Sequence, residues 1–253
     1  MRAQLRLQLL GMILTLALLL TGCATDRAFR EKQARAYRDR GERYLGADQS
    51  SQALEQFLEA LKIYPDDPYL HYDLAYTYDV KGMLDKTVYH LKEAIRLKPD
   101  YSDAYNYLGF IYFSRGEVDE AIQYYHKALG NELYMNPESA HNNLGLAYLR
   151  RKEYRKAVSH LEEAVRLVPD YAVAYNNLGK AYEGLGQYDK ARFSYEKAVQ
   201  FSPQYAEAYL NLGKLLYRSG ERNRARWSFG QVIRLEPASE MAMEAKRYLN
   251  RLQ

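Results

Sequence analysis

The stretch "YNNLGKAYEGLGQYDKARFSYEKAVQFSP" (175–203) decides the fold, because it recurs 34 residues later as "YLNLGKLLYRSGERNRARWSFGQVIRLEP" (209–237). Apolar residues within each copy recur at spacings of three and four, which predicts amphipathic helices. Both copies carry "NLG" near the start and a proline at the end. Similarity at such a fixed period is typical of stacked repeats rather than of one closed core.

The pattern extends through most of the chain, with further copies at 37–65, 71–99, 105–129 and 141–169. A small residue marks the register at a spacing of 34, with a single spacing of 36, at Gly41, Ala75, Gly109, Gly145, Gly179 and Gly213. We expect this residue to lie where two helices approach closely. We expect the closing prolines to lie between helices, where a missing N–H costs little, at Pro65, Pro99, Pro169, Pro203 and Pro237.

This pattern resembles the tetratricopeptide repeat over about residues 34–239. The resemblance implies an all-α fold, a superhelical solenoid of six helix-turn-helix repeats with a C-terminal capping helix at 239–253. The repeats are expected at 34–67, 68–101, 102–137, 138–171, 172–205 and 206–239.

The N-terminus has the features of a signal peptide at residues 1–22. Arg2 and Arg6 precede the apolar run "LLGMILTLALLL" (9–20), which is too short for a confident transmembrane span. "LTGC" then resembles the bacterial lipobox, which implies lipid on Cys23, the chain's one cysteine, followed by a tether at 23–33. Ala24 in place of Asp implies the inner face of the outer membrane, facing the periplasm. A plain secretory peptide with a chance cysteine is the alternative.

The composition disfavours several classes of function. The chain has 253 residues, of which 47% are hydrophobic, and its net charge of +4 without a long basic run does not indicate nucleic acid. The five histidines lack metal-ligand spacing, and there is no motif for a nucleophile or a phosphate loop. We therefore predict a protein that is not an enzyme and needs no cofactor or metal.

In proteins of this fold, the first helix of each repeat lines a groove that binds a protein or peptide segment. Asn143, Asn177 and Asn211 match an asparagine ladder, since a carboxamide can bond a peptide N–H and C=O together. The alternative is that asparagine is merely tolerated there. Aromatic groove positions are Tyr69, Tyr72, Tyr76, Tyr107, Phe110 and Phe113, and basic ones are Arg150, Lys180, Lys214 and Arg218. Packing between repeats is the alternative role for each tyrosine.

One joint breaks the period. The segment "GNELYMNPES" (130–139) carries Leu133, Tyr134 and Met135, which either pack back on the array or make contacts. With the lipobox and tether, the pattern N-x-L-Y-x-x-P-E resembles the tetratricopeptide lipoproteins that act as pilotins for the type IV pilus secretin (the PilF/PilW/Tgl family). The resemblance implies a membrane-anchored scaffold whose partner is a secretin subunit. The alternative is a general envelope adaptor that recruits a periplasmic protease or a peptidoglycan enzyme.

Overall fold

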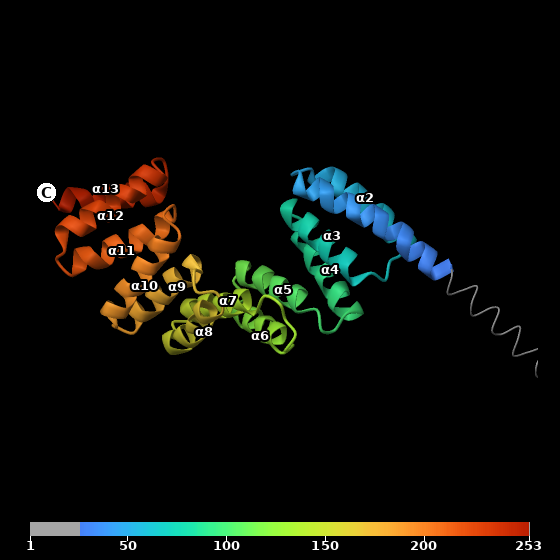
Figure 1. Ribbon diagram of the computed structural model, residues 1–253, viewed down its shortest axis with the longest axis horizontal. Helices are drawn as coiled ribbons and strands as arrows, with labels where there is room; N and C mark the ends of the chain where they lie inside the picture. Colours follow the sequence, from blue (N-terminus) through green and yellow to red (C-terminus); the bar gives the residue numbers. More distant parts are fainter. Residues whose placement is uncertain (1–25, 253) are drawn as a thin grey trace, which may run out of the picture. The chain divides into compact units, whose positions relative to one another are not determined.

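The computed structural model describes residues 26–252, and every regular element in that range is a helix (Figure 1). The all-α prediction is therefore confirmed. Contacts divide the chain into two compact units, one ending at Ala104 and one beginning at Tyr105. The predicted signal peptide, Cys23 and Ala24 lie outside the described residues. Within the described part, no helix is both long and apolar enough to cross a membrane.

The first unit contains a long helix at 26–46 and three helices that follow it. These are α2 (Ser50–Ile63), α3 (Pro68–Val80) and α4 (Leu84–Leu97). Phe57, Leu70 and Leu74 are fully buried and form the centre of its core. Each helix contacts the next in sequence, as a stack of helical hairpins requires.

The second unit continues the succession of helical hairpins. Its helices are α5 (Ser102–Ser114, whose first residues precede the unit boundary), α6 (Val118–Leu129), α7 (Pro137–Arg150), α8 (Tyr154–Leu167), α9 (Ala172–Gly184), α10 (Tyr188–Phe201), α11 (Ala206–Arg218), α12 (Arg222–Leu235) and α13 (Glu240–Arg251). One continuous core runs through these helices, with Tyr125, Leu161, Tyr195 and Phe229 almost fully buried.

Close approach of paired helices explains the small residue that marks the register. A Cβ added at Gly145 would lie 2.4 Å from Leu161 Cγ, and one at Gly179 would lie 2.4 Å from Tyr195 Cε1. Both distances are far inside van der Waals contact. The expectation that helices approach closely at these positions is confirmed.

The turn inside each hairpin needs a left-handed residue at one position, seven after the small residue. Glycine fills it four times, at Gly82, Gly116, Gly186 and Gly220, with φ between 71° and 86°. Asp48 and Lys152 occupy the same position with φ of 57° and 59°. Side chains other than glycine are unfavourable in this region, so these two turns store local strain.

The closing prolines lie between helices, as expected. Helices α2, α4, α8, α10 and α12 each end two residues before one. Pro137 is different, because it occupies the first turn of α7. Proline is tolerated there since that N–H has no partner within the helix.

The last helix packs on the array as a cap should. Helix α13 buries Ala242 and Ala245, and the Tyr248 ring stacks on Phe229 with centroids 4.9 Å apart. Arg226 donates to the Leu252 carbonyl at 3.0 Å. Helix α13 therefore covers the apolar face of α12 at the C-terminal end of the array.

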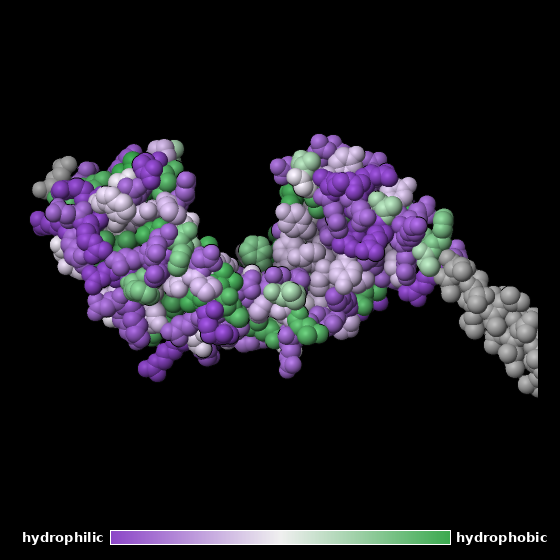
Figure 2. Space-filling model, viewed as in Figure 1, coloured by the Kyte–Doolittle hydropathy of each residue, from purple (hydrophilic) through white to green (hydrophobic). Residues whose placement is uncertain are grey.

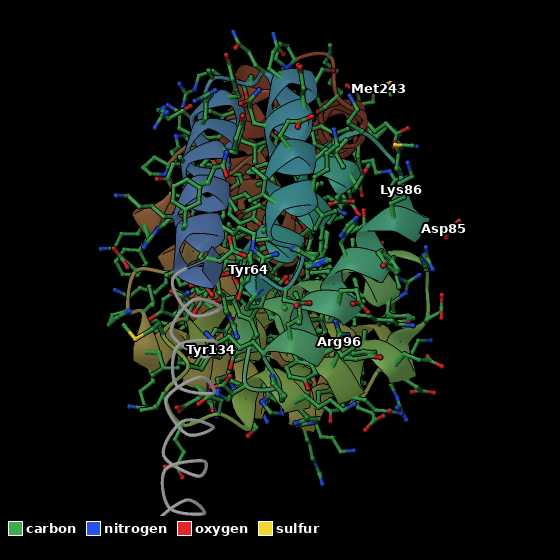
Figure 3. The ribbon with its side chains drawn as sticks, turned by 90° about the vertical axis from the view of Figure 1, so that its right-hand side faces the viewer. Tyr64, Asp85, Lys86, Arg96, Tyr134 and Met243 are labelled. Carbon is green, nitrogen blue, oxygen red and sulfur yellow. The ribbon has the colours of Figure 1, made fainter. Side chains whose placement is uncertain are left out.

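The described part of the predicted tether is helical. Residues 26–33 belong to the long helix described at 26–46. Ion pairs at i,i+4 spacing, such as Arg27–Glu31 at 3.0 Å, favour this helix. Arg27 also donates to Tyr64 Oη at 2.9 Å, and Tyr64 lies beside the described N-terminal end of this helix (Figure 3). The segment thus reaches a shorter distance than an extended chain would.

Candidate protein-binding site

Exposed apolar side chains are the features that mark contact surfaces on this array. Figure 2 shows a mostly hydrophilic surface on the visible face of each unit, interrupted by separate hydrophobic patches. Since single exposed apolar residues are common in any protein, groups on one helix face are more informative. The first helices α3 and α5 each carry such a group.

In the first unit, α3 carries Tyr69, Tyr72 and Tyr76 at spacings of three and four, which place them on one helix face. Tyr69 is 40% exposed and Tyr76 is 49% exposed. The ring of Tyr101 lies 5.3 Å from those of both Tyr69 and Tyr72. Burial, followed by the charge of Asp103, raises the pKa of Tyr72 to about 12. We call these four residues the α3 tyrosine surface.

A half-buried ion pair lies beside the α3 tyrosine surface. Arg38 donates to Asp73 at 2.5 Å, and its guanidinium carbon lies 5.3 Å from the Tyr69 ring centroid. Burial raises the pKa of the Asp73 carboxyl to about 6, although Arg38 acts in the opposite direction. Asp73 occupies the groove position that asparagine fills in later repeats, and its pairing with Arg38 could not be read from the repeat pattern.

In the second unit, α5 carries Tyr107, Phe110 and Phe113, which we call the α5 aromatic surface. The rings of Tyr107 and Phe110 lie 6.3 Å apart, and Phe110 is 48% exposed. Arg150 covers Phe113, with its guanidinium carbon 5.2 Å from the ring centroid, and donates to the Phe113 carbonyl at 3.2 Å. Arg150 thus bonds a carbonyl at the C-terminal end of α5 rather than standing as an isolated positive charge.

The asparagine ladder bonds to a second column of asparagines. Asn143 donates to Asn106 at 3.0 Å, and Asn177 donates to Asn142 at the same distance. In the same way, Asn211 donates to the Asn176 carbonyl oxygen at 2.9 Å. One N–H of each predicted ladder residue is therefore directed at the preceding first helix.

The three ladder positions differ in how deeply they are buried. Asn177 is 4% exposed, whereas Asn143 and Asn211 are half-buried. The second column, three residues before each glycine, was not singled out from the sequence. Its signal was present, because "NN" occurs at 142–143 and 176–177. The ladder's role in holding a peptide stays a prediction.

The basic groove positions have acidic partners. Lys180 pairs with Glu207, Lys214 pairs with Glu244 at 2.7 Å, and Arg218 pairs with Glu183. Burial alone would raise the pKa of Glu207, but Lys180 and the hydrogen bonds from Tyr205 and Asn176 bring it below its usual value. Neighbouring helices therefore already neutralise these positive charges.

The irregular joint between α6 and α7 presents two apolar side chains on a fixed turn. Asn131 Oδ1 accepts from the Leu133 N–H at 2.9 Å, and the Asn131 carbonyl accepts from the Tyr134 N–H at 3.1 Å. Tyr134 is only 9% exposed and packs with Ala128 and Ala140 (Figure 3). Leu133 and Met135 are 84% and 86% exposed. Tyr134 therefore packs back on the array, whereas a contact made by Leu133 and Met135 stays a prediction.

Four of the five histidines form two equivalent pairs. His71 and His90 approach at 2.9 Å between their Nδ1 atoms, and His141 and His160 do so at 3.1 Å. Both pairs are separated by 19 residues, a signal that was visible in the sequence. Among the described residues, no group of three or more His, Cys, Asp or Glu side chains could hold a metal ion.

Comparison with known families gives a match over most of the array. The tetratricopeptide repeat matches residues 57–88, 100–168, 136–204 and 185–243. Among curated proteins, the chain is 24% identical over 172 residues, 56% of its length, to the Hsp70-Hsp90 organising protein of Plasmodium falciparum. It is 31% identical over 119 residues, 46% of its length, to the BBSome complex member BBS4 of Bos taurus. It spans only 30% and 22% of those two proteins.

Solved structures give a similarity over nearly the whole array. One is that of PilW, described as a widely conserved type IV pilus biogenesis factor, with a TM-score of 0.77 at 21% identity over 84% of this chain and 98% of that one. The pilF protein of Pseudomonas aeruginosa gives a TM-score of 0.77 at 23% identity, over 86% and 98%. YrrB, a protein with an unusual peptide-binding site, gives 0.58 at 21% identity, over 76% and 97%. At these identities the similarity establishes the shared fold.

Proposed function

Because the chain belongs to the tetratricopeptide-repeat family, whose members are protein-binding scaffolds, we propose that it is a membrane-anchored pilotin that assists assembly of the type IV pilus secretin. The observation that carries the proposal is the fold shared with PilW and pilF over 98% of both of those chains. The lipobox at Cys23 and the N-x-L-Y-x-x-P-E segment at 131–138 support it independently.

The proposed mechanism is binding without catalysis. Acyl chains on Cys23 would hold the array at the inner face of the outer membrane, since more than one chain gives stable rather than marginal anchoring. The α3 tyrosine surface and the α5 aromatic surface would each bind an apolar or amphipathic part of a secretin subunit. Burying exposed rings releases water and favours association.

The joint between α6 and α7 would form a second contact. Its turn is held by Asn131 and by the buried Tyr134, so the backbone at Leu133 and Met135 loses little freedom when a partner covers these side chains. A contact that is already ordered costs less entropy on binding. The ion-paired Lys180 and Lys214 would contribute little, because a partner's carboxylate must first displace Glu207 or Glu244.

The first experiment removes the gene and detects the secretin on an unboiled gel by immunoblot. We expect loss of the high-mass ring, with monomeric secretin retained in the inner-membrane fraction. An intact ring with normal pili would contradict the pilotin role. The chain would then be an anchored scaffold for another envelope client.

A second experiment locates the surface with matched variants. Tyr76→Ser with Phe110→Ser changes groove rings that are 49% and 48% exposed. Tyr89→Ser with Tyr188→Ser changes rings on second helices that are 58% and 57% exposed. We expect only the first pair to reduce secretin rings, at equal protein level. Equal effects of both pairs, or none, would place the contact elsewhere.

A further inference from the structure

The long helix at 26–46 has two different faces. Ala34 and Gly41 are buried on its inner face, where Tyr37 and Leu45 pack against the core of the first unit. The opposite face carries five exposed residues at spacings of three and four, which we call the outer stripe: Phe29, Lys32, Ala36, Arg40 and Arg43. The Phe29 ring is 66% exposed, so this face of the helix is open to a contact.

The bases of the outer stripe keep their positive charge available. In the part of the chain that the structure describes, none of Lys32, Arg40 and Arg43 forms an ion pair. Arg40 donates to the neutral Gln56 amide at 3.3 Å. Three of the helix's four acids pair instead with arginines that lie off the stripe, at 2.9–3.4 Å. The fourth, Asp39, is exposed beside the stripe and offsets one of its charges.

Positive charge in the first unit is concentrated in this helix. Residues 26–46 contain seven Lys and Arg against four Asp and Glu, a net charge of +3. Residues 47–104 contain six against eleven, a net charge of −5. The unit thus carries a positive helix on a negative body. A negatively charged plane attracts the helix and repels the body, which turns the outer stripe toward that plane.

The neighbouring sequence favours a membrane as that plane. The outer stripe begins six residues after Cys23, the residue at which the lipobox implies an acyl anchor. Six residues span at most about 20 Å, so an anchored chain would hold Phe29 within that distance of the lipid headgroups. Exposed bases accompanied by an aromatic ring are typical of helices that lie in the plane of a membrane interface.

We propose that the outer stripe binds the anionic headgroups of a phospholipid bilayer. Lys32, Arg40 and Arg43 would lie at the level of the phosphates, and the Phe29 ring would enter the interface beside them. Each base near an anionic surface strengthens binding roughly fivefold. The contact would fix how the helix lies on the membrane, which an anchor at one residue cannot do. It depends neither on lipid at Cys23 nor on the pilotin role.

The test uses the chain from Ala24 onward, which lacks Cys23 and the apolar run but keeps the described core residues of both units. Its partition onto sedimented vesicles of equal parts phosphatidylcholine and phosphatidylglycerol is compared with that onto vesicles of phosphatidylcholine alone. We expect binding at least about tenfold stronger to the anionic vesicles, weakened when salt rises from about 0.1 M to about 0.5 M. Equal partition onto the two kinds of vesicle, or none onto either, would overturn the proposal.

Two double variants of equal net charge locate the contact. Lys32→Gln with Arg43→Gln removes two charges from the outer stripe, and Lys81→Gln with Lys92→Gln removes two exposed charges elsewhere in the same unit. We expect the stripe variant to partition onto the anionic vesicles roughly twentyfold more weakly, and the control variant to change by less than about threefold. Equal weakening by the two would overturn the proposal.

A third variant separates a membrane contact from simple attraction to phosphate groups. Phe29→Ser leaves every charge in place and changes a ring that is 66% exposed, so the fold has little reason to change. We expect it to weaken partition roughly threefold or more, because the ring no longer enters the interface. Unchanged partition of this variant would contradict insertion of the ring. Should the stripe double variant fail to fold by circular dichroism, Lys32→Gln alone decides, with an expected loss of roughly fivefold.

Discussion

Acidification should destabilise the protein through two stacked histidines. His90 is 6% exposed, stacks on Tyr78 and approaches His71 at 2.9 Å between Nδ1 atoms. His71 Nε2 lies 2.9 Å from the Pro65 carbonyl, which only accepts, so Nε2 carries the proton of neutral His71. The Nδ1 of His71 is then an acceptor, and His90 donates from its own Nδ1.

The pKa values give the direction and size of the effect. Burial, then His71 and Lys86, lower the pKa of His90 to about 4, although Glu93 acts in the opposite direction. Burial and the other two histidines near it lower the pKa of His160 to about 4. The unfolded chain binds these protons near pH 6.5 and the folded chain does not, so stability is full above pH 6.5 and falls toward pH 4.

The magnitude follows from the two values. A histidine with a pKa of about 6.5 unfolded and about 4 folded loses about 2 kcal/mol of stability between about pH 7.5 and pH 5. His160 is only half-buried, so we expect roughly 3 kcal/mol for the two together. The free energy of unfolding would be measured by urea denaturation with far-ultraviolet circular dichroism at both pH values.

The control is already present in the third repeat. Tyr124 occupies the position of His90 and His160 and stacks on Tyr112. The double variant His90→Tyr with His160→Tyr keeps a ring in both stacks but removes both titrating groups. We expect it to lack the roughly 3 kcal/mol loss that the two histidines cause between about pH 7.5 and pH 5, whereas the raised pKa of Asp73 acts in the opposite direction and equally in both proteins. An equal loss of stability in the wild type and in this variant would refute the reasoning.

Three further predictions concern glycines, a turn and the irregular joint, all measured by urea denaturation. Gly179→Ala should lower the free energy of unfolding by about 1–3 kcal/mol, because the added Cβ would lie 2.4 Å from a buried ring. Gly230→Ala should raise it by about 0.5–1 kcal/mol, because the added Cβ meets nothing within 4 Å. Lys152→Gly should stabilise by roughly 0.5–1 kcal/mol because φ there is 59°; an unchanged value would show that the turn is unstrained. Tyr134→Ala should cost roughly 2–4 kcal/mol and Leu133→Ser less than about 0.5 kcal/mol, as their exposures of 9% and 84% require; similar losses would contradict the anchored turn.

The sequence predicted the features that every repeat must share. The small residue at Gly145 or Gly179 has one geometric solution, which is contact with the large residue sixteen positions later. The closing prolines likewise have one place, between helices. A constraint that applies to every repeat is visible in a single sequence, because the same type of residue recurs at a fixed spacing. This is why the fold class could be predicted from the sequence.

Features carried by one or two repeats could not be derived in this way. The positive φ at Asp48 and Lys152 can be inferred only from the register, because glycine fills the same position in the other four repeats and neither residue type indicates it alone. The helical conformation of residues 26–33 is supported by local ion pairs and by the contact of Arg27 with Tyr64. The repeat pattern does not predict such contacts, because they are formed by residues that are not equivalent between repeats.

The difference between features shared by all repeats and local contacts also applies to the charges of the groove. Lys180 and Lys214 are basic groove positions in the sequence, yet Lys180 bonds Glu207 on α11 and Lys214 bonds Glu244 on the capping helix α13. Exposed ion pairs contribute little and must be broken before a partner can use either charge. The ring of Phe110 carries no charge, so covering it breaks no ion pair and removes water from an apolar surface. We therefore expect selectivity along this array to depend more on where rings are exposed than on charge.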